Sequence, residues 1–530
     1  MLHGQVSEVC YPFAASSEIR VDGDLSDSAW LSARRITKFT QRELTLGDPA
    51  TERTEVAIAY DREALYIAVW CYDSEPSKVR AKEFQRDFDY SLDDNFILVF
   101  DTYHDKRNGF LFATNPNGAR MDAQIFGNGA STNKYWDGVW DVKVRRTGEG
   151  WFAEFKIPLY TLKYRTHLSN QDWGVNFERN IRRKREQVRW KGWGRDYNIK
   201  QLNQAGLLKG LLNLRDKQFM EVKPYGIGGA QSDGDEKALA NGGGDVNYLL
   251  SPNYRLNVTV NTDFAQVESD QQQVNITRFP LYFPELRPFF LEGNDYFDMG
   301  YGGNRITPFY TRRIGLDENR EAVPIIAGAR LLGKDNNRTL GIMSIQTAKT
   351  DGQESTNYTV GSWRQDLGEQ SVIGAMSVNR FVEGNWHTTT GLRGTYRTSK
   401  LFGDKNFSLG GTYVQTHTND TSFDPKAYAY RLYATYFNDK WDAIITTQQS
   451  PEPFNPEAGL MRRRNFRESF ALFKFKPRPK GKLKWIRQFD LSPGSFTLVQ
   501  YNDDESLQSF EYSLKFFGFE TRSGENIGAE

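Results

Sequence analysis

The chain has 530 residues, which is more than one hydrophobic core usually serves, so its length predicts at least two domains. Its 68 Lys and Arg residues balance 67 Asp and Glu residues, which argues against a nucleic-acid-binding surface. Aromatic residues make up 14% of the chain and Gly is frequent, which is typical of many strands joined by tight turns. No apolar run reaches the roughly 18–20 residues of a membrane-spanning helix, so a membrane-embedded part would have to be built from strands.

Residues 1–17 are predicted to be an N-terminal extension. They contain neither the basic segment nor the apolar segment of a secretion signal. We therefore expect either a protein that stays inside the cell or a chain whose true start is missing. The two cysteines, Cys10 and Cys71, are too few for a disulfide scaffold and lack metal-ligand spacing.

Residues 18–212 show the pattern of an antiparallel β-sandwich. In residues 54–73, apolar residues alternate on both sides of a short turn, which predicts a hairpin. The nearly continuous apolar run 94–103 predicts a central strand. A second hairpin is expected in residues 139–159, with its tip at Thr147–Gly150. Helical periodicity is almost absent.

Five pieces of this region, taken in order, resemble the family 9 carbohydrate-binding module and its relatives. They are VDGDLSDSAW, the hairpin that contains LYIAV, the strand DNFILVFD, and the segments GWFAEFKIPL and WGVNFERNIRR. The resemblance implies a jelly-roll-like antiparallel sandwich that holds a sugar between aromatic faces, with polar side chains bonding its hydroxyl groups. It also implies that a structural calcium ion is bound in some members.

The resemblance implies two aromatic positions for the sugar site. Just before the acidic strand, Tyr90 or Phe88 would serve where the family has tryptophan, which is a departure from the family pattern. After the segment WGVNFERN, the candidates are Trp190 and Trp193. Because aromatic side chains bury large areas wherever they lie, the alternative is that these residues cover sandwich edges or a domain junction.

Aspartates are concentrated around two predicted strands and their turns. Asp93, Asp94 and Asp101 are candidate ligands of a structural calcium ion, because calcium prefers carboxylate and carbonyl oxygens. Two alternatives stay open. The aspartates could stabilise turns and ion pairs, or two of them could be the catalytic carboxylates of a glycoside hydrolase, which would have to face each other across a cleft.

From residue 213 to residue 530 the composition changes, and apolar and polar residues alternate in segment after segment. Residues 217–270 are predicted to hold two strands joined by a polar, Gly-rich loop. Thirteen strand candidates, spaced about 20 residues apart, predict a transmembrane-type antiparallel β-barrel that is incomplete at its C-terminus. A β-propeller or a second sandwich is the soluble alternative, but it would need a repeated motif that the sequence lacks.

Residues 279–315 interrupt this alternation and are predicted to form a plug-like segment. Its centre, FPELRPFFLEGNDYF, contains two prolines, which remove backbone donors, so we expect neither a helix nor a strand there. Three of its aromatic residues, Phe289, Phe290 and Phe297, are expected to lie against the inner wall of the barrel. The segment would either gate a path for solutes or be fixed filling, and we favour the second.

The charged residues of the plug-like segment are expected to pair with each other or with charges of the barrel lumen and to form a connected network, because a buried charge is tolerated only when it is paired. The expected members are Glu285, Arg287, Glu292, Arg312 and Arg313.

The run DFAQVESDQQQVNITRFPLYFPELRPFFLEG, followed by FYTRRIG, resembles the signature of a largely uncharacterised bacterial outer-membrane family, best known from Bacteroidetes-type genomes. In that family a family-9-like sugar-binding domain precedes a β-barrel. Such proteins usually begin with a secretion signal and extend further, so this chain is expected to be a fragment cut at both ends.

These patterns lead to one main hypothesis and two alternatives. The main hypothesis is an outer-membrane protein, in contact with outer-membrane lipid, that captures or takes up a poly- or oligosaccharide and binds no nucleic acid. The first alternative is a glycoside hydrolase that cleaves O-glycosyl bonds of a polysaccharide. The second is a non-catalytic envelope component that binds other envelope proteins through its sandwich. We expect a protein without catalytic activity.

Overall fold

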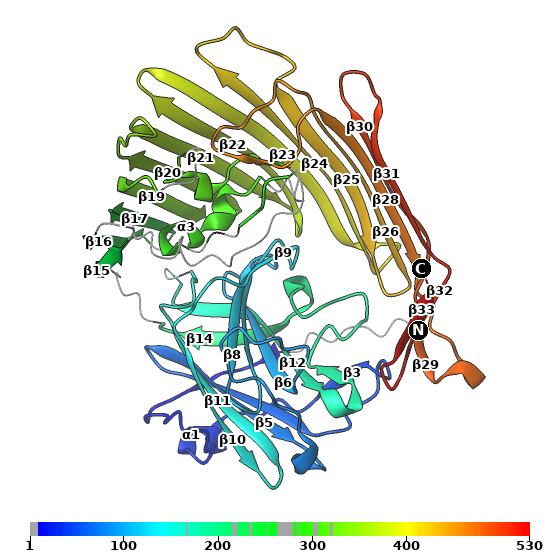
Figure 1. Ribbon diagram of the computed structural model, residues 1–530. Helices are drawn as coiled ribbons and strands as arrows, with labels where there is room; N and C mark the ends of the chain where they lie inside the picture. The colour runs from blue at the N-terminus through cyan, green and yellow to red at the C-terminus, as the bar shows by residue number, and fades with distance from the viewer. Residues whose placement is uncertain are drawn as a thin grey trace.

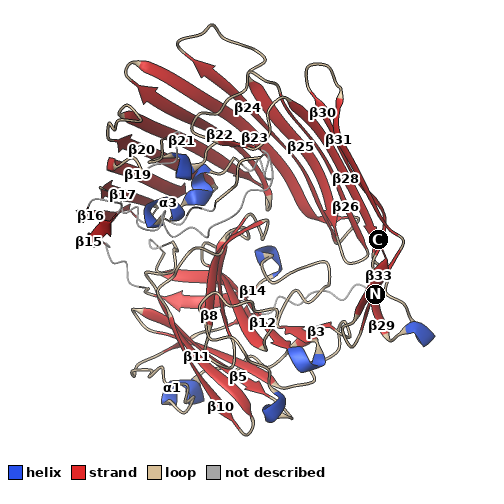
Figure 2. Cartoon of the chain, in the orientation of Figure 1, coloured by secondary structure: helices blue, strands red, loops and turns tan. Residues whose placement is uncertain are grey.

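The structure is a computed structural model that describes residues 9–165, 168–214, 220–232, 236–251, 253–261, 279–283, 285, 287–299, 306–317, 322–335 and 337–529. Two β-rich parts follow each other along the chain, a sandwich and a large curved sheet. Figure 1 shows the sandwich, in blue and cyan, below one end of the curved sheet, in green to red. Helices are few and short (Figure 2). The prediction of a nearly all-β chain with an N-terminal sandwich is therefore confirmed.

Two sheets face each other in the sandwich. One has the order β1-β14-β12-β6-β7-β8-β9, with β13 paired to β12 and β3 paired to β13, and the other has the order β10-β11-β5-β4-β2. The strands are β1 (Val9–Cys10), β2 (Phe13–Ala14), β3 (Thr40–Glu43), β4 (Thr54–Tyr60), β5 (Ala64–Tyr72), β6 (Asn95–Asp101), β7 (Gly109–Thr114), β8 (Arg120–Phe126), β9 (Ser131–Asn133), β10 (Asp141–Thr147), β11 (Gly150–Pro158), β12 (Asn170–Ile181), β13 (Glu186–Arg189) and β14 (Gly206–Leu212).

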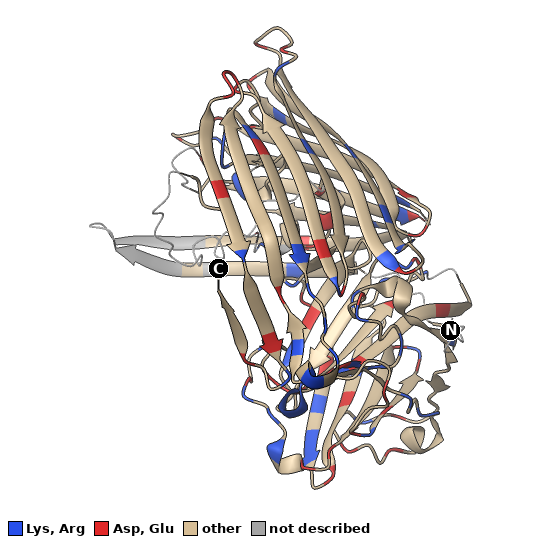
Figure 3. Ribbon diagram, turned by 90° about the vertical axis from the view of Figure 1, so that its right-hand side faces the viewer, with Lys and Arg blue, Asp and Glu red and all other residues tan. Residues whose placement is uncertain are grey.

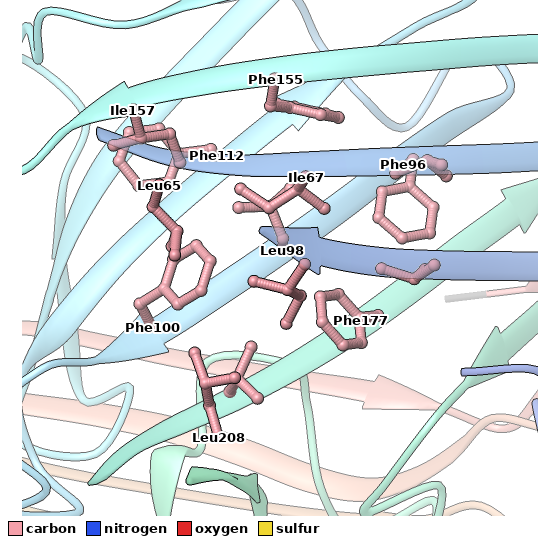
Figure 4. Packing of buried hydrophobic residues seen from close by; sticks show 14 of the residues in the cluster. Leu65, Ile67, Phe96, Leu98, Phe100, Phe112, Phe155, Ile157, Phe177 and Leu208 are labelled. Atoms are coloured by element: carbon pink, nitrogen blue, oxygen red, sulfur yellow. The ribbon is translucent and has the colours of Figure 1, made fainter. Parts of the chain in front are cut away.

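The hairpins expected from alternation are β4–β5 and β10–β11, and β6 lies between β12 and β7 as a central strand. Apolar side chains from both sheets meet between them and bury a core (Figure 4). Phe96, Leu98 and Phe100 of β6 face Leu65 and Ile67 of β5 across this core. Burial of this apolar surface is the main force that holds the two sheets together. Two short edge pairs, β1–β14 and β2–β4, are parallel, so the sandwich is not wholly antiparallel.

The large sheet contains fourteen strands, each antiparallel to its neighbours. Its strands, in pairing order, are β15 (Met220–Ser232), β16 (Glu236–Ser251), β17 (Tyr254–Val260), β19 (Ile325–Asp335), β20 (Arg338–Thr347), β21 (Thr356–Leu367), β22 (Ser371–Val382), β23 (Asn385–Leu401), β24 (Lys405–Thr418), β25 (Tyr428–Phe437), β26 (Trp441–Ser450), β28 (Phe466–Phe475), β30 (Leu491–Tyr501) and β31 (Leu507–Lys515). In the part of the chain that the structure describes, β15 and β31 are the two ends of this order. Closure of the sheet into a cylinder therefore stays a prediction.

Two details of the large sheet differ from the expectation. The Gly-rich stretch expected as a loop is part of β16, because Gly242, Gly243 and Gly244 pair with β15 as ladder residues. Its high glycine content weakened the alternation on which the expectation rested. The last predicted segment divides in two: β31 joins the large sheet, whereas β32 (Phe517–Thr521) pairs with β29 (Ile486–Phe489) and β33 (Asn526–Ala529).

The remaining elements are short. β18 (Ile306–Thr307) pairs with β27 (Leu460–Met461), which ties the plug-like segment to the loop before β28. The helices are α1 (Ser28–Ser32), α3 (Pro288–Leu291) and the 3-10 turns η1 (Pro76–Lys78), η2 (Arg182–Lys184), η3 (Leu202–Gln204), η4 (Asn294–Phe297), η5 (Thr311–Arg313) and η6 (Gly481–Leu483). No helix in the described ranges is long and apolar enough to cross a membrane.

The plug-like segment lies on the concave side of the large sheet (Figure 1). Phe289, Phe290 and Phe297 are buried in one cluster with side chains of β19 to β22, among them Ile345 and Val360. The expectation that the segment would contain no helix was wrong. One helical turn, α3, begins at Pro288, and proline is tolerated at a first helical position because no backbone N–H is needed there.

Candidate functional site

The sandwich lies against the turns at one end of the large sheet. Arg107 donates hydrogen bonds to the carbonyl oxygens of Leu367 (3.0 Å) and Ser371 (2.9 Å), at the β21–β22 turn. Asp196 accepts hydrogen bonds from Lys405 Nζ (2.7 Å) and from the backbone N–H of Asp439 (2.6 Å). These contacts come from three successive hairpin turns, so the sandwich covers this end of the curved sheet.

A second group of contacts is centred on Glu43 of β3, whose carboxylate is buried. Arg478 and Arg487, both from the C-terminal part of the chain, each approach it to 3.1 Å, and Arg195 of the sandwich approaches it to 3.5 Å. Burial alone would raise the pKa of Glu43, but the hydrogen bond from Arg487 and the charge of Arg478 outweigh burial and lower this pKa. Arg478 also pairs with Asp439 and Arg487 with Glu520, both at 2.7 Å, so the junction holds a network of alternating charges.

A cavity of about 670 Å³ lies between the two parts of the molecule, next to Glu43. Its lining combines aromatic rings, side-chain amides and guanidinium groups. The aromatic and amide residues are Tyr197, Phe407, Tyr433, Phe437, Asn128, Asn198, Gln201, Gln370, Asn406, Asn438 and Gln488. Rings offer flat apolar faces, and amides both donate and accept hydrogen bonds, so the lining suits a ligand rich in hydroxyl groups.

The four aromatic residues predicted for the sugar site lie in different surroundings. Phe88 is buried in the core under β7 and β8, and Trp190 is 5% exposed and packs on Phe177. Tyr90 is half-buried against the same core as Phe88. Trp193, by contrast, is 39% exposed. Phe88 and Trp190 are therefore too buried to contact a sugar. Of the four predicted residues, Trp193 and the half-buried Tyr90 stay candidates for the sugar site.

The three aspartates predicted as calcium ligands accept hydrogen bonds from N–H groups of the protein. Asp93 accepts from the backbone of Lys82 and Glu83, both at 2.9 Å. The Asp94 carboxylate accepts from the Arg182 backbone at 2.7 Å, and Asp101 accepts from the backbone of residues 105 and 106.

No group of three or more His, Cys, Asp or Glu side chains in the described ranges could hold a metal ion. The proposal that Asp93, Asp94 and Asp101 form one calcium site is therefore not supported by their arrangement. Their oxygens instead fix the turns before and after β6, which was the alternative that the sequence left open.

Several buried carboxylates of the sandwich have a raised pKa. Burial raises the pKa of Asp94 to about 6, of Asp122 to about 6 and of Glu154 to about 7. Their partners differ: Asp94 accepts from Arg182, Asp122 from Gly138 and Arg86, and Glu154 from Trp30. Each carboxylate thus anchors a separate loop or turn. These hydrogen bonds do not hold two carboxylates opposite each other across a cleft, as a glycosidase needs.

The charged residues of the plug-like segment make two kinds of contact. Arg287 donates three hydrogen bonds to the Glu285 carboxylate, two from its guanidinium and one from its backbone N–H, and it also donates to the carbonyl oxygens of Thr311 and Ile314, both at 2.8 Å. Arg312 is buried, and its guanidinium lies 5.8 Å from the Phe283 ring, whereas Arg313 is exposed.

Glu292 is contacted from other parts of the molecule. It pairs with Arg255 of β17 and lies 3.7 Å from both Arg330 of β19 and Lys163 of the sandwich. The segment is therefore held by the sheet and by the sandwich together. The expected network allowed partners on the wall of the barrel, whereas the contact with Lys163 of the sandwich lies beyond it.

Sequence reasoning missed the cavity between the two parts of the molecule. Its charged centre joins Glu43 to Arg478, which are 435 positions apart. No motif or spacing connects such distant residues, and a single charged side chain in a loop is indistinguishable from an ordinary surface residue. The one available signal was the unusual density of arginine in the segment 182–195.

Comparison with known proteins gives one family match and a set of structural neighbours. A family model described as a domain of unknown function (DUF5916) matches residues 220–330. No curated protein matches the sequence.

The solved structures similar to this chain each cover about two fifths of it. A family 9 carbohydrate-binding module from Caldicellulosiruptor kristjanssonii, in complex with cellotriose, is 16% identical with a TM-score of 0.28, over 38% of this chain and 93% of that chain. The same module in complex with glucose gives 16% identity and a TM-score of 0.28, over 40% and 99% of the two chains. A structure from Bacteroides uniformis is 12% identical with a TM-score of 0.32, over 38% of this chain and 98% of that one.

Proposed function

We propose that this chain is a bacterial outer-membrane protein that captures or takes up a glycan, and that the glycan binds between the sandwich and the curved sheet. One observation carries the proposal. The sheet exposes apolar side chains on its convex face, and the sandwich covers one end of it, so that a polar, aromatic-lined cavity lies between the two parts. In this proposal the sheet is the wall of a transmembrane barrel and the sandwich is its soluble domain.

The convex face of the sheet supports the membrane part of the proposal. Eleven strands that are consecutive in the sheet each expose at least one large apolar side chain. These side chains are Ile326, Ile342, Trp363, Ile373, Leu392, Leu409, Leu432, Ile445, Phe473, Phe496 and Phe510. Figure 3 shows that charged residues are few along the strands of the curved sheet that face the viewer. A contiguous apolar surface of this kind is rare on water-soluble monomers and typical of a surface that meets lipid or another protein.

The lining of the cavity supports the carbohydrate part of the proposal. Tyr197 comes from the sandwich and Tyr433 from β25, so both parts of the molecule contribute an aromatic ring. Asn406 and Gln201 lie at the same junction, where their side chains hydrogen-bond to each other at 3.2 Å. A sugar ring can stack on an aromatic face while its hydroxyl groups bond to amides, and this combination orients a ligand as well as binding it.

The membrane part is tested by spin labels on single introduced cysteines. Cys10 and Cys71 are buried, so a cysteine that replaces Leu409 on the convex face is the reactive one. A nitroxide at Leu409→Cys, in protein reconstituted into lipid vesicles, should relax faster with oxygen than with a water-soluble nickel complex. The control is Asp351→Cys in the exposed turn after β20, where nickel should be more effective. Equal access of nickel to both positions would contradict the membrane assignment.

The carbohydrate part is tested by glycan-array binding of the intact protein in detergent, followed by calorimetry of any ligand found. Tyr433→Ala should weaken binding by about tenfold if the ring stacks on a sugar in the cavity. Trp193→Ala is the matched control, because Trp193 does not line the cavity. A loss confined to Trp193→Ala would place the sugar on the sandwich surface instead, and no signal from any glycan would refute the carbohydrate assignment.

A further inference from the structure

The connections at the two ends of the large sheet differ in length. At the end that the sandwich covers, three residues each join β21 to β22, β23 to β24 and β25 to β26, namely 368–370, 402–404 and 438–440. At the opposite end, away from the sandwich in Figure 1, the connections β20–β21, β24–β25 and β26–β28 have eight, nine and fifteen residues, namely 348–355, 419–427 and 451–465. Long loops therefore gather at the end that points away from the sandwich.

Each of the three short turns contacts the sandwich. The Gly368 carbonyl oxygen accepts from Arg107, and the Asp404 carbonyl oxygen accepts from the Tyr197 hydroxyl at 3.0 Å. In the third turn, the contact is the hydrogen bond from the Asp439 backbone N–H to the sandwich. The sandwich thus begins at the level of the short turns.

Two connections depart from this division. The connection β22–β23 at the far end has two residues, 383–384, and the connection β28–β30 at the sandwich end has fifteen, 476–490. The second contains β29 and Arg487, which pairs with Glu43 of the sandwich. Its length therefore serves contacts with the sandwich, and the asymmetry rests on the six connections named above.

At the sandwich end, apolar side chains of the convex face reach the ends of the strands. Leu367 is the last residue of β21 and Trp441 the first of β26, and both are 44% exposed. The Trp441 ring lies 4.3 Å from the ring of Phe475, the last residue of β28. Tryptophan and other aromatic residues are typical of the boundary between lipid and water. The short turns therefore lie at the level expected for one membrane surface.

At the opposite end, uncharged polar side chains separate the apolar part of the convex face from the long loops. We call them the polar band: Ser344, Gln346, Asn357, Thr359, Asn379 and Thr388. Ser344 is two positions from the exposed Ile342, so the band lies on the convex face. Its members bond to each other: the Ser344 and Thr359 hydroxyl oxygens are 3.2 Å apart, and Thr388 donates to Asn379 Oδ1 at 2.8 Å.

The polar band shows that the strands continue past the apolar region at this end. Beyond the band, the tip of the β22–β23 hairpin carries Phe381 and Trp386 on the same face, and the Trp386 ring packs against His417 at 5.1 Å. The apolar region is therefore displaced along the strands toward the sandwich, and the long loops stand further from it than the short turns do.

We propose that the end of the sheet with the long loops faces the cell exterior, and that the sandwich and the cavity of about 670 Å³ beside it face the periplasm. In outer-membrane barrels the periplasmic turns are short and the extracellular loops are longer. This inference rests on the membrane part of the proposed function, and it names the side from which the glycan reaches its site. The cavity then takes its glycan from the periplasm and not from the surrounding medium.

The test is cysteine labelling in Gram-negative cells that export the intact protein to their outer membrane, with a maleimide too polar to cross that membrane. Cys10 and Cys71 are buried, so the introduced cysteines give the signal. Asp351→Cys and Thr421→Cys, in two of the long loops, should react in intact cells. Arg62→Cys and Glu149→Cys, in exposed turns of the sandwich, should react only after the outer membrane is permeabilised.

The same four variants in detergent are the control, because all of them should react there. Reaction of the sandwich pair in intact cells, with the loop pair protected, would overturn the inference and leave the membrane part of the proposed function intact. Reaction of both pairs in intact cells, or of neither pair, would mean that no membrane separates the two ends of the sheet. That result would overturn the inference and the membrane part together.

Discussion

Arg107 of the sandwich donates a hydrogen bond to the carbonyl oxygen of Gly368, at the tip of the β21–β22 turn, at 2.5 Å. The same guanidinium reaches the carbonyl oxygens of Leu367 and Ser371 and is almost fully buried by the turn. One side chain thus satisfies three backbone acceptors of the sheet, and the position of the sandwich over the sheet depends strongly on it.

Replacement of Arg107 by methionine should loosen the sandwich from the sheet without unfolding either part. The change leaves three carbonyl oxygens without their charged donor, two of them on the exposed residues Leu367 and Gly368, where water can replace it, so the cost is about 1–3 kcal/mol. Amide hydrogen exchange at the β21–β22 turn and in the loop after β6 should rise, while exchange in the sandwich core should not. Arg145→Met is the control, since Arg145 is exposed and pairs with Asp24 within the sandwich. Equal exchange in both variants would show that docking does not depend on Arg107.

Replacement of Arg287 by methionine should destabilise the plug-like segment strongly. Arg287 is 1% exposed and pairs with Glu285, so the change leaves a buried carboxylate without its counter-charge, at a cost of about 3–5 kcal/mol. The thermal unfolding temperature, measured in detergent, should fall. The double variant Glu285→Gln/Arg287→Met should lose less than the single one, because it leaves no unpaired charge.

Arg313→Met is the control for this measurement, since Arg313 lies in the same segment but is exposed. A double variant that is less stable than Arg287→Met would contradict the assignment of the cost to an unpaired carboxylate.

Replacement of Leu409 by arginine should impair insertion into a membrane but not solubility in detergent. At the centre of a bilayer, a lipid-facing arginine costs about 2–4 kcal/mol, whereas the same change at a water-exposed position is nearly neutral. The measurement is the yield of folded protein in lipid vesicles, judged by resistance to protease. Asp351→Arg, in an exposed turn, should insert normally. Normal insertion of the Leu409 variant would argue that the convex face meets something other than lipid.

Glu52 should make the sandwich sensitive to acid. Burial alone would raise its pKa, but hydrogen bonds from Lys184, Ser74 and Arg183 outweigh burial and lower the pKa to about 2. A carboxylate whose pKa is lower in the folded than in the unfolded state stabilises the fold above the unfolded pKa of about 4.5, and this contribution is lost as the pH falls toward 2.

Glu52→Gln should therefore lower the free energy of unfolding by about 1–2 kcal/mol at pH 7, and the difference from the unmodified protein should vanish as the pH approaches 2. Urea unfolding followed by tryptophan fluorescence at several pH values measures this. Glu149→Gln, in an exposed turn of the same sandwich, is the control and should change stability little. A difference that persists at pH 2 would mean that the contacts of Glu52 do not depend on its charge.

Local backbone preferences explain what the sequence determined by itself. The period of two in residues 387–399 predicted β23, because successive side chains of a strand must point to opposite faces. The same rule predicted the hairpins of the sandwich and nearly every strand of the large sheet. It failed at residues 242–244, where glycine has no side chain to mark a face.

Only the tertiary structure decided which side chains are available for binding. Trp190 and Trp193 are three positions apart and chemically identical, yet the first is buried in the core and the second is 39% exposed. Likewise, Glu43 meets Arg478 only because the sandwich is docked on the sheet. Strand formation depends on neighbours in the chain, whereas a site depends on contacts between residues that are distant in it, and those follow from packing.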